Sequence, residues 1–319
     1  MLFRSTDPNY TGTTDATLSI AKAAATVSLS DLTTTYDGTP KPVSFVTSPT
    51  GLTVDVTYDG LSTAPSAQGT YTVVATIRDN NYRGTATGTL LVANALATVT
   101  ISNLSATYDG NSHAVQVSTD PAGLAVDVTY NGSSTPPTDA GTYTVVATVN
   151  DPNWAGSATS TLVIDKAVAT ITLGALNTTY DGNTHAATIT TSPTGLAADV
   201  TYNASATEPT DAGTYTVVAT VNDQDYTGTA TDSLVIDKAP ATVTLADLNH
   251  VFDGLGHTVT PSTTPAGLTV IVTYDGSTTP PVDAGAYNVV ATITDPNYTG
   301  SATAQMVVDR KSTRLNSSH

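Results

Sequence analysis

The sequence predicts an all-β protein, a tandem array of small β-sandwich domains that together form an elongated rod. Three observations lead to this prediction. A Tyr-Asp-Gly motif recurs at a fixed long spacing, short runs within each period alternate between apolar and polar residues, and no run has helical periodicity. Thr and Val, which favour strands, are abundant, whereas good helix formers other than Ala are scarce.

The repeat boundaries follow from columns of residues that keep one spacing. The motif begins at Tyr36, Tyr108 and Tyr180, and recurs as Phe-Asp-Gly at Phe252, so that each step is 72 residues. The segment PTDAGTYTVVATVND occurs twice without change, at 137–151 and at 209–223. We therefore expect repeats at 23–94, 95–166, 167–238 and 239–308, preceded at 1–22 by the tail of a truncated repeat.

Within repeat 95–166, five runs alternate with period two, which is the pattern of a half-buried strand. These runs are 97–101, 113–117, 124–130, 142–150 and 157–165. Gly, Pro, Asn and Asp fill the segments between them, as turns require. A unit of this size buries only about 60% of its chain surface, so we expect adjacent repeats to pack on each other.

Both ends of the chain depart from the repeat. Residues 309–319 (DRKSTRLNSSH) resemble the in-frame translation of a sequencing-adapter oligonucleotide, and residues 1–5 (MLFRS) resemble its reverse complement. We therefore expect both segments to be cloning artefacts, with 309–319 disordered, and we exclude them from the fold prediction. On this interpretation the chain is a fragment, and a signal or anchor would lie outside it.

The composition argues against several classes of partner. Lys and Arg number 10 and Asp and Glu number 27, which gives a formal net charge of −17. Nucleic acids and anionic membrane surfaces select basic patches, so we expect no nucleic acid and no membrane contact within this fragment. The chain has no Cys, which excludes disulfides and thiolate metal sites.

One segment in each repeat indicates the type of sandwich. Residues 139–145 (DAGTYTV) resemble the D-x-G-x-Y-x-C run of immunoglobulin domains, with Val145 in the Cys position. In that family the Tyr hydroxyl bonds backward to the chain and forms a tyrosine corner. The resemblance implies immunoglobulin-like sandwiches, although Ala67 replaces the Asp in the first repeat. The expected corner residues are Tyr71, Tyr143, Tyr215 and Tyr287.

The whole repeat also resembles the MBG/YDG-type repeats of large bacterial exported proteins. The motifs TYDG, PAGL, VTYNG, DAGTYTVVAT, DPNW and LVIDKA carry this resemblance over nearly all of 6–308. It implies a non-catalytic stalk or spacer of a bacterial adhesin, at the cell surface or secreted. Some mucin-binding relatives have a β-grasp fold, which is the alternative architecture. That fold needs a helix of about ten residues, and we find no such segment.

The junctions and the chemistry of the side chains fit a structural role. The junction LVIDKAVATITL has no Gly, Pro or Ser-rich stretch, so we expect a semi-stiff connection. No nucleophile, base and orienting residue occur in a recognisable pattern, and we expect neither an enzyme nor a cofactor. His113, His185 and His257 share a column with Lys41, which we expect to be exposed.

Two sets of residues are candidates for binding. Asp165 and Asp237 lie at the junctions, where Ca²⁺ binding with a turn Asp of the next repeat competes with plain turn capping and a solvated acidic surface. An aromatic column lies at a predicted hairpin tip, where the rings either stack on sugars or pack on their own turn or the adjoining repeat. Its members are Tyr82, Trp154, Tyr226 and Tyr298.

These candidates leave two alternatives to the stalk. The repeats themselves would bind glycans or mucin through the aromatic column, or the fragment would be an accessory region of a large secreted enzyme. In the stalk interpretation, a host or environmental glycan or protein is bound by other regions of the protein.

Overall fold

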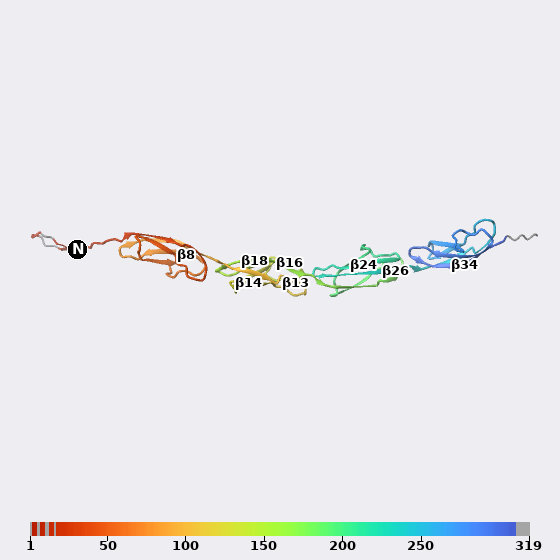
Figure 1. The fold of residues 1–319 in the computed structure, drawn as a ribbon, viewed down its shortest axis with the longest axis horizontal. Coiled ribbons are helices and arrows are strands. Elements are labelled where there is room, and N and C mark those ends of the chain that lie inside the picture. Colours follow the sequence, from red (N-terminus) through yellow and green to blue (C-terminus); the bar gives the residue numbers. More distant parts are fainter. Residues whose placement is uncertain (1, 5–6, 10–12, 16, 311–319) are drawn as a thin grey trace, which may run out of the picture. The chain divides into compact units, whose positions relative to one another are not determined.

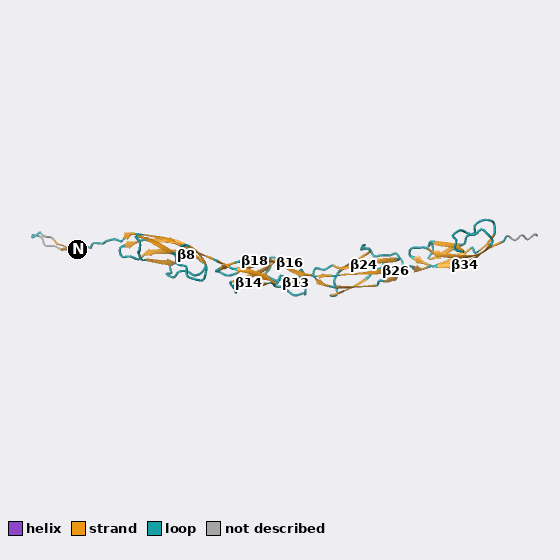
Figure 2. Ribbon diagram, in the orientation of Figure 1, coloured by secondary structure: helices purple, strands orange, loops and turns teal. Residues whose placement is uncertain are grey.

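The structure is a computed structural model that describes residues 2–4, 7–9, 13–15 and 17–310 (Figure 1). The described residues form strands and turns, with no helix (Figure 2). Contacts divide the chain into two units, one of residues 1–106 and 110–164 and the other of residues 107–109 and 165–319. Near the start, β1 (Leu2–Arg4) pairs antiparallel with β2 (Thr13–Asp15).

The third repeat illustrates the architecture. Its main sheet has four strands in the order β21-β26-β24-β23, and its second sheet pairs β20 with β22. Within the main sheet β21 runs parallel to β26, whereas the other neighbours are antiparallel. A short parallel bridge joins β19 to β25. The bounds are β19 Ala167–Val168, β20 Thr170–Gly174, β21 Asn177–Thr179, β22 Thr188–Ser192, β23 Ala198–Tyr202, β24 Gly213–Val221, β25 Tyr226–Thr227 and β26 Thr229–Asp237.

The other repeats have the same strand order and the same two sheets. Repeat 1 contains β3 Ala23–Ala24, β4 Thr26–Ser30, β5 Thr33–Thr35, β6 Ser44–Ser48, β7 Val54–Tyr58, β8 Gly69–Ile77, β9 Tyr82–Arg83 and β10 Thr85–Ala93. Repeat 2 contains β11 Ala95–Leu96, β12 Thr98–Ser102, β13 Ser105–Thr107, β14 Gln116–Asp120, β15 Val126–Tyr130, β16 Gly141–Val149, β17 Trp154–Ala155 and β18 Ser157–Asp165. Repeat 4 contains β27 Ala239–Pro240, β28 Thr242–Ala246, β29 Asn249–Val251, β30 Thr260–Thr264, β31 Val270–Tyr274, β32 Gly285–Ile293, β33 Tyr298–Thr299 and β34 Ser301–Asp309.

The core of each repeat lies between its two sheets. In β24 and β26 alternate side chains point inward, and Val217, Leu234 and Ile236 are at most 2% exposed. The opposite faces of these strands carry exposed Thr and Ser together with the half-buried Val218 and Val235. This alternation is the signature of a sheet that buries one face, and it is the pattern from which the sequence predicts the strands.

The structure confirms the predicted fold class, an all-β array of immunoglobulin-like sandwiches. The β-grasp alternative is wrong for the described residues, because they contain no helix. The run expected at 113–117 forms a strand only from Gln116, since the backbone before it turns to bind a tyrosine hydroxyl. Asp309 was expected to be disordered, but it ends β34 and its carbonyl accepts a hydrogen bond from Phe252 N (2.8 Å). The rest of the segment that is expected to be disordered, residues 311–319, lies outside the described residues.

Candidate functional site: the joints between repeats

Among the described residues, the structure brings no three His, Asp or Glu side chains together in a way that could hold a metal ion. Within the same residues, no helix is long and apolar enough to cross a membrane. The arrangement that recurs instead is a joint, in which the end of one repeat is attached to the turn that begins with Asp151 or its counterparts in the next repeat.

The first component of the joint is a backbone strap. In repeat 2 the linker strand β11 runs parallel to β17, and Ala95 N and Ala97 N donate to the carbonyls of Asn153 and Ala155, both at 2.9 Å. Gly156 permits this approach, because a Cβ there would lie 2.3 Å from the carbonyl oxygen of Ala97. The same close contact recurs at Gly84, Gly228 and Gly300. The linker is therefore part of the repeat that follows it and is no free tether.

The second component is an aromatic pair. Trp154 meets Tyr36 of the preceding repeat with ring centroids 5.9 Å apart and an interplanar angle of 82°. In the second unit, Tyr298 meets Tyr180 at 5.3 Å and 80°. These are edge-to-face contacts, worth about 0.5–1.5 kcal/mol beyond the area that they bury. Each pair joins two columns of the sequence, the Tyr-Asp-Gly tyrosine and the hairpin-tip aromatic.

The structure therefore places three of the four candidate ligand-binding aromatics against another tyrosine. The third of them, Tyr226, contacts Tyr108 with ring centroids 5.3 Å apart and an interplanar angle of 77°. Both tyrosines belong to the second unit. The fourth, Tyr82, lies half-buried in β9. Of the two arrangements considered for this column, the geometry matches packing on a neighbouring tyrosine.

The third component is a side-chain hydrogen bond from the same turn. Asn153 Oδ1 accepts from the backbone N of Gln68 at 2.9 Å, and Asn297 Oδ1 accepts from Ala212 N at 2.7 Å. Asn297 Nδ2 also donates to Asp211 Oδ1 at 3.0 Å. The two donor N–H groups, of Gln68 and Ala212, each lie three residues before the corner tyrosine of the preceding repeat, so the joint is fixed at two places. Sequence reasoning missed these two asparagines, although both of them end a DPN motif.

The turn itself is held by an aspartate and by the residue that ends the previous repeat. Asp151 Oδ1 accepts from Asn153 N (2.8 Å) and Trp154 N (3.2 Å). Lys166 Nζ and Lys238 Nζ donate to the carbonyls of Asp223 (2.6 Å) and Asp295 (2.8 Å) in the turns that follow them. These aspartates thus act as turn caps.

The calcium candidates lie elsewhere. Asp165 and Asp237 are the exposed last residues of β18 and β26, and their main-chain carbonyls accept hydrogen bonds from Tyr108 N (2.8 Å) and Tyr180 N (2.9 Å). Within the described part of the chain, neither carboxylate belongs to a group that could hold a metal ion.

The corner tyrosines make the backward hydrogen bond typical of immunoglobulin domains. Each hydroxyl donates to the carbonyl of the residue four positions earlier. The pairs are Tyr71 to Ala67 (3.0 Å), Tyr143 to Asp139 (2.8 Å), Tyr215 to Asp211 (2.9 Å) and Tyr287 to Asp283 (2.8 Å). Because the acceptor is a main-chain carbonyl, the replacement of Asp by Ala67 leaves the bond intact.

A second tyrosine column is the better buried one, and sequence reasoning missed its role. Tyr202 is 5% exposed, and its hydroxyl accepts the backbone N–H of Ala187 at 2.9 Å. The bond connects the end of β23 in the main sheet to the segment that leads into β22 in the second sheet. Equivalent bonds join Tyr58 to Val43, Tyr130 to Val115 and Tyr274 to Val259. The signal was present in the sequence as the VTY that precedes each tight turn.

The column of Lys41 and three histidines is largely buried, although the sequence predicts that it is exposed. The side chains of Lys41 and His257 are 15% and 10% exposed, and each faces the aspartate four residues earlier. Lys41 Nζ lies 2.5 Å from Asp37 Oδ2, and His185 Nε2 lies 3.1 Å from Asp181 Oδ1. The column tolerates the buried ammonium of Lys41 because Asp37 supplies the opposite charge.

These contacts change the acidity of two aspartates. Hydrogen bonds from Lys41 and Thr39 hold the pKa of Asp37 well below its usual range. Hydrogen bonds from the backbone and side chain of Asn183 lower the pKa of Asp181, and the nearby His185 adds to this effect. Both aspartates are therefore fixed as anions in the turn at physiological pH.

The joints, the tyrosine corner and the two-sheet core define a class of protein, namely a tandem array of immunoglobulin-like domains. The family model of the MBG domain matches residues 25–96, 97–168, 169–240 and 241–312. The chain belongs to the MBG domain family, which confirms the resemblance drawn from its motifs. Each match begins two residues after the boundary expected from the sequence.

Solved structures with which the chain aligns include other strings of immunoglobulin domains. The chain is 16% identical to Sidekick-1 immunoglobulin domains 1–5, with a TM-score of 0.30. The alignment covers 90% of this chain and 81% of that one. The chain is also 12% identical to the ICAM-5 D1–D4 ectodomain fragment, with a TM-score of 0.32. That alignment covers 89% of this chain and 99% of the fragment. A search of curated proteins found no relative of similar sequence.

Proposed function

We propose that this chain is a non-catalytic stalk of a bacterial adhesin, located at the cell surface or secreted, which holds another region of the protein away from its anchor. The observation that carries the proposal is the joint. A spacer needs connections that resist bending. The joints at Trp154 and Tyr298 each combine a backbone strap, an aromatic pair and a side-chain hydrogen bond. The strong negative charge of the chain favours solubility and an exposed location.

A deletion of one period tests the proposal. Removal of residues 167–238 brings the end of β18 directly to a linker of the same kind, because Ala239 occupies the position of Ala167. We expect small-angle scattering to show a shorter particle of the same cross-section, with unchanged circular dichroism per residue. An unchanged maximum dimension, or unfolding of the remaining repeats, would contradict a stalk made of interchangeable units.

The glycan- or mucin-binding alternative has less support, since Trp154 and Tyr298 already contact a neighbouring tyrosine. Binding of the wild type to a glycan array, together with the loss of this binding in Trp154→Ala, would support the glycan-binding alternative. The alternative of an accessory region in a large secreted enzyme would be tested by the coding sequence on either side of this chain.

A further inference from the structure

Each sandwich is open along one side. In the described strands, β14 has β12 as its only ladder partner, and β15 has β16 as its only ladder partner. The same holds for β22 and β23 in repeat 3. Since β14 leads directly into β15, which belongs to the other sheet, two unpaired strand edges lie along one groove. An unpaired edge offers a row of backbone donors and acceptors to another strand.

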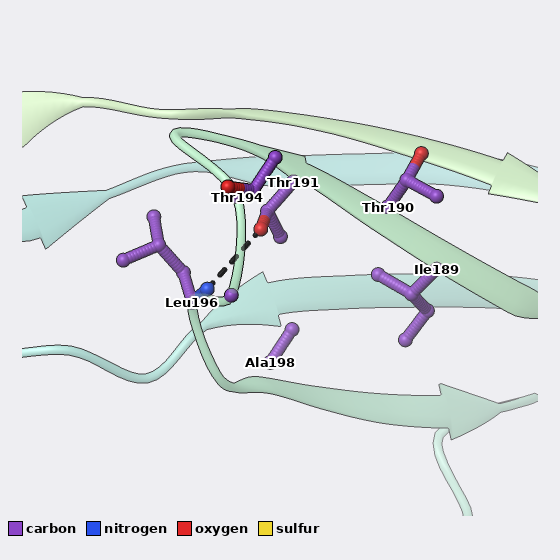
Figure 3. Close-up of a pocket in the computed structure, with 7 residues that line it drawn as sticks. Ile189, Thr190, Thr191, Thr194, Leu196 and Ala198 are labelled. Carbon is purple, nitrogen blue, oxygen red and sulfur yellow. Dashed lines mark hydrogen bonds between the residues drawn. The ribbon is translucent and has the colours of Figure 1, made fainter.

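The groove between these edges is lined mainly by apolar side chains. In repeat 2 it has a volume of about 520 Å³, and its lining includes Val117 from β14 and Val126 and Val128 from β15. In repeat 3 the groove measures about 360 Å³, and its lining includes Ile189 from β22 and Ala198 from β23 (Figure 3). These side chains are only half-buried, unlike the fully buried positions of β16 and β24.

The fourth repeat reveals which way the backbone faces. Pro261 occupies the position of Val117 and Ile189, and it stays in register with Leu245 of β28 although it has no N–H. The nitrogen at this position must therefore face away from the partner strand, because a ladder donor could not be replaced by proline. It follows that the N–H groups of Val117 and Ile189 face the open side of their sandwiches.

We propose that the grooves of repeats 2 and 3 bind an extended basic peptide segment of another protein as an additional β-strand. The free edge supplies main-chain hydrogen bonds, and the groove accepts alternate apolar side chains of the incoming strand. The edge strands also carry exposed carboxylates, Asp120 and Asp127 in repeat 2 and Asp199 in repeat 3, which alternate with the half-buried residues of these strands. On this opposite face they favour Lys or Arg at the alternate positions of the incoming strand. A second copy of this chain, with the same net charge of −17, would be repelled.

The test uses the full chain and a capped nine-residue peptide of alternating Lys and Val. Hydrogen exchange followed by mass spectrometry reads each edge separately. We expect the peptide to slow exchange of the amides of 116–120 and 188–192 at least tenfold at low salt. In Val117→Pro the first segment should lose this protection while the second keeps it, so that repeat 3 is an internal control. Because repeat 4 forms the same strands with Pro261, this variant should fold, which circular dichroism will verify.

Four outcomes would overturn the proposal. They are the absence of protection in the wild type, equal protection of 116–120 in Val117→Pro, equal protection by a peptide with Glu in place of Lys, and concentration-dependent protection without peptide, which would identify a second copy as the occupant. A reciprocal variant, Pro261→Val, should gain protection at 260–264, and its failure to do so would refute the role assigned to the backbone at this position.

Discussion

At the scale of single residues, the two tyrosine columns differ in what their hydroxyls do. The hydroxyl of Tyr215 donates to a carbonyl at the half-exposed corner, where water can replace it. The hydroxyl of Tyr202 is an acceptor inside the core, and its loss would leave the N–H of Ala187 buried without a partner. An unsatisfied buried group costs more than a lost exposed bond.

We therefore expect Tyr202→Phe to destabilise repeat 3 by about 1–3 kcal/mol and Tyr215→Phe by about 0.5–1.5 kcal/mol. Hydrogen exchange of the β24 amides in the two variants measures the difference directly. The reverse order of the two effects would show that the corner, and not the core tyrosine, holds the sheets together.

A second residue-scale prediction concerns acid. The pKa of Asp37 is lower in the folded chain than in the unfolded chain, where it has an ordinary value of about 3.9, so folding is favoured by the anion. This contribution is present above about pH 4 and is lost progressively as the pH falls below that value.

Urea unfolding at a series of pH values between 2 and 6, followed by circular dichroism, should show a shallower acid decline for Asp37→Asn than for the wild type. Lys41→Met should have the same effect, because the hydrogen bond from Lys41 is the largest cause of the shift. An acid decline that neither variant changes would mean that other carboxylates control acid stability.

At this scale the sequence predicted the corner tyrosines, because the D-x-G-x-Y run is a local motif. It did not predict the burial of Lys41 and His257. A variable charged column looks like a solvated surface, and the compensating aspartate four residues earlier becomes evident only when the turn is seen.

At the scale of elements, the strap between β11 and β17 depends on a residue without a side chain. Gly156→Ala would place a Cβ 2.3 Å from the carbonyl oxygen of Ala97, and backbone cannot yield as a flexible side chain would. We expect a loss of more than about 1 kcal/mol and faster exchange of the Ala95 and Ala97 amides.

Gly256→Ala is a matched control, since its Cβ would meet only Pro280, with Cβ at 3.4 Å and the carbonyl oxygen at 3.6 Å, which are ordinary contacts. Unfolding measurements on both variants decide the point. If Gly156→Ala is as stable as Gly256→Ala, the strap is not a rigid part of the repeat.

The long strands could be predicted, and the short ones could not. Strands such as β18 alternate over nine residues, which gives a clear period-two signal. The strap β11 has two residues and β13 has three, too few to establish any period. The two-residue straps pair in parallel in all four repeats, and the counterparts of β13 do so in repeats 1, 3 and 4. Parallel partners that are distant in sequence leave no local signal.

At the scale of the whole molecule, the joints decide whether the array acts as a spacer, and the chain carries one built-in reporter. Trp154 is its only Trp and lies in the joint between repeats 1 and 2. Tyr36→Ala removes the ring that contacts Trp154 and should weaken the joint by about 0.5–1.5 kcal/mol.

The fluorescence of Trp154 should then shift to the red and become easier to quench with acrylamide. Tyr180→Ala removes the equivalent ring of another joint and should leave the fluorescence unchanged. Identical spectra for the wild type and Tyr36→Ala would mean that the aromatic pair contributes nothing to the joint.

The parallel pairing of β21 with β26 has a mechanical consequence. A repeat that is pulled by its neighbours is loaded through its first and last strands, and here the last strand lies alongside an early one that runs in the same direction. Tension would slide these two strands past each other and strain the rungs Asn177–Val235, Thr178–Ile236 and Thr179–Asp237 simultaneously. Unzipping would break such rungs one at a time and needs less force, so each domain is built to stay folded under shear.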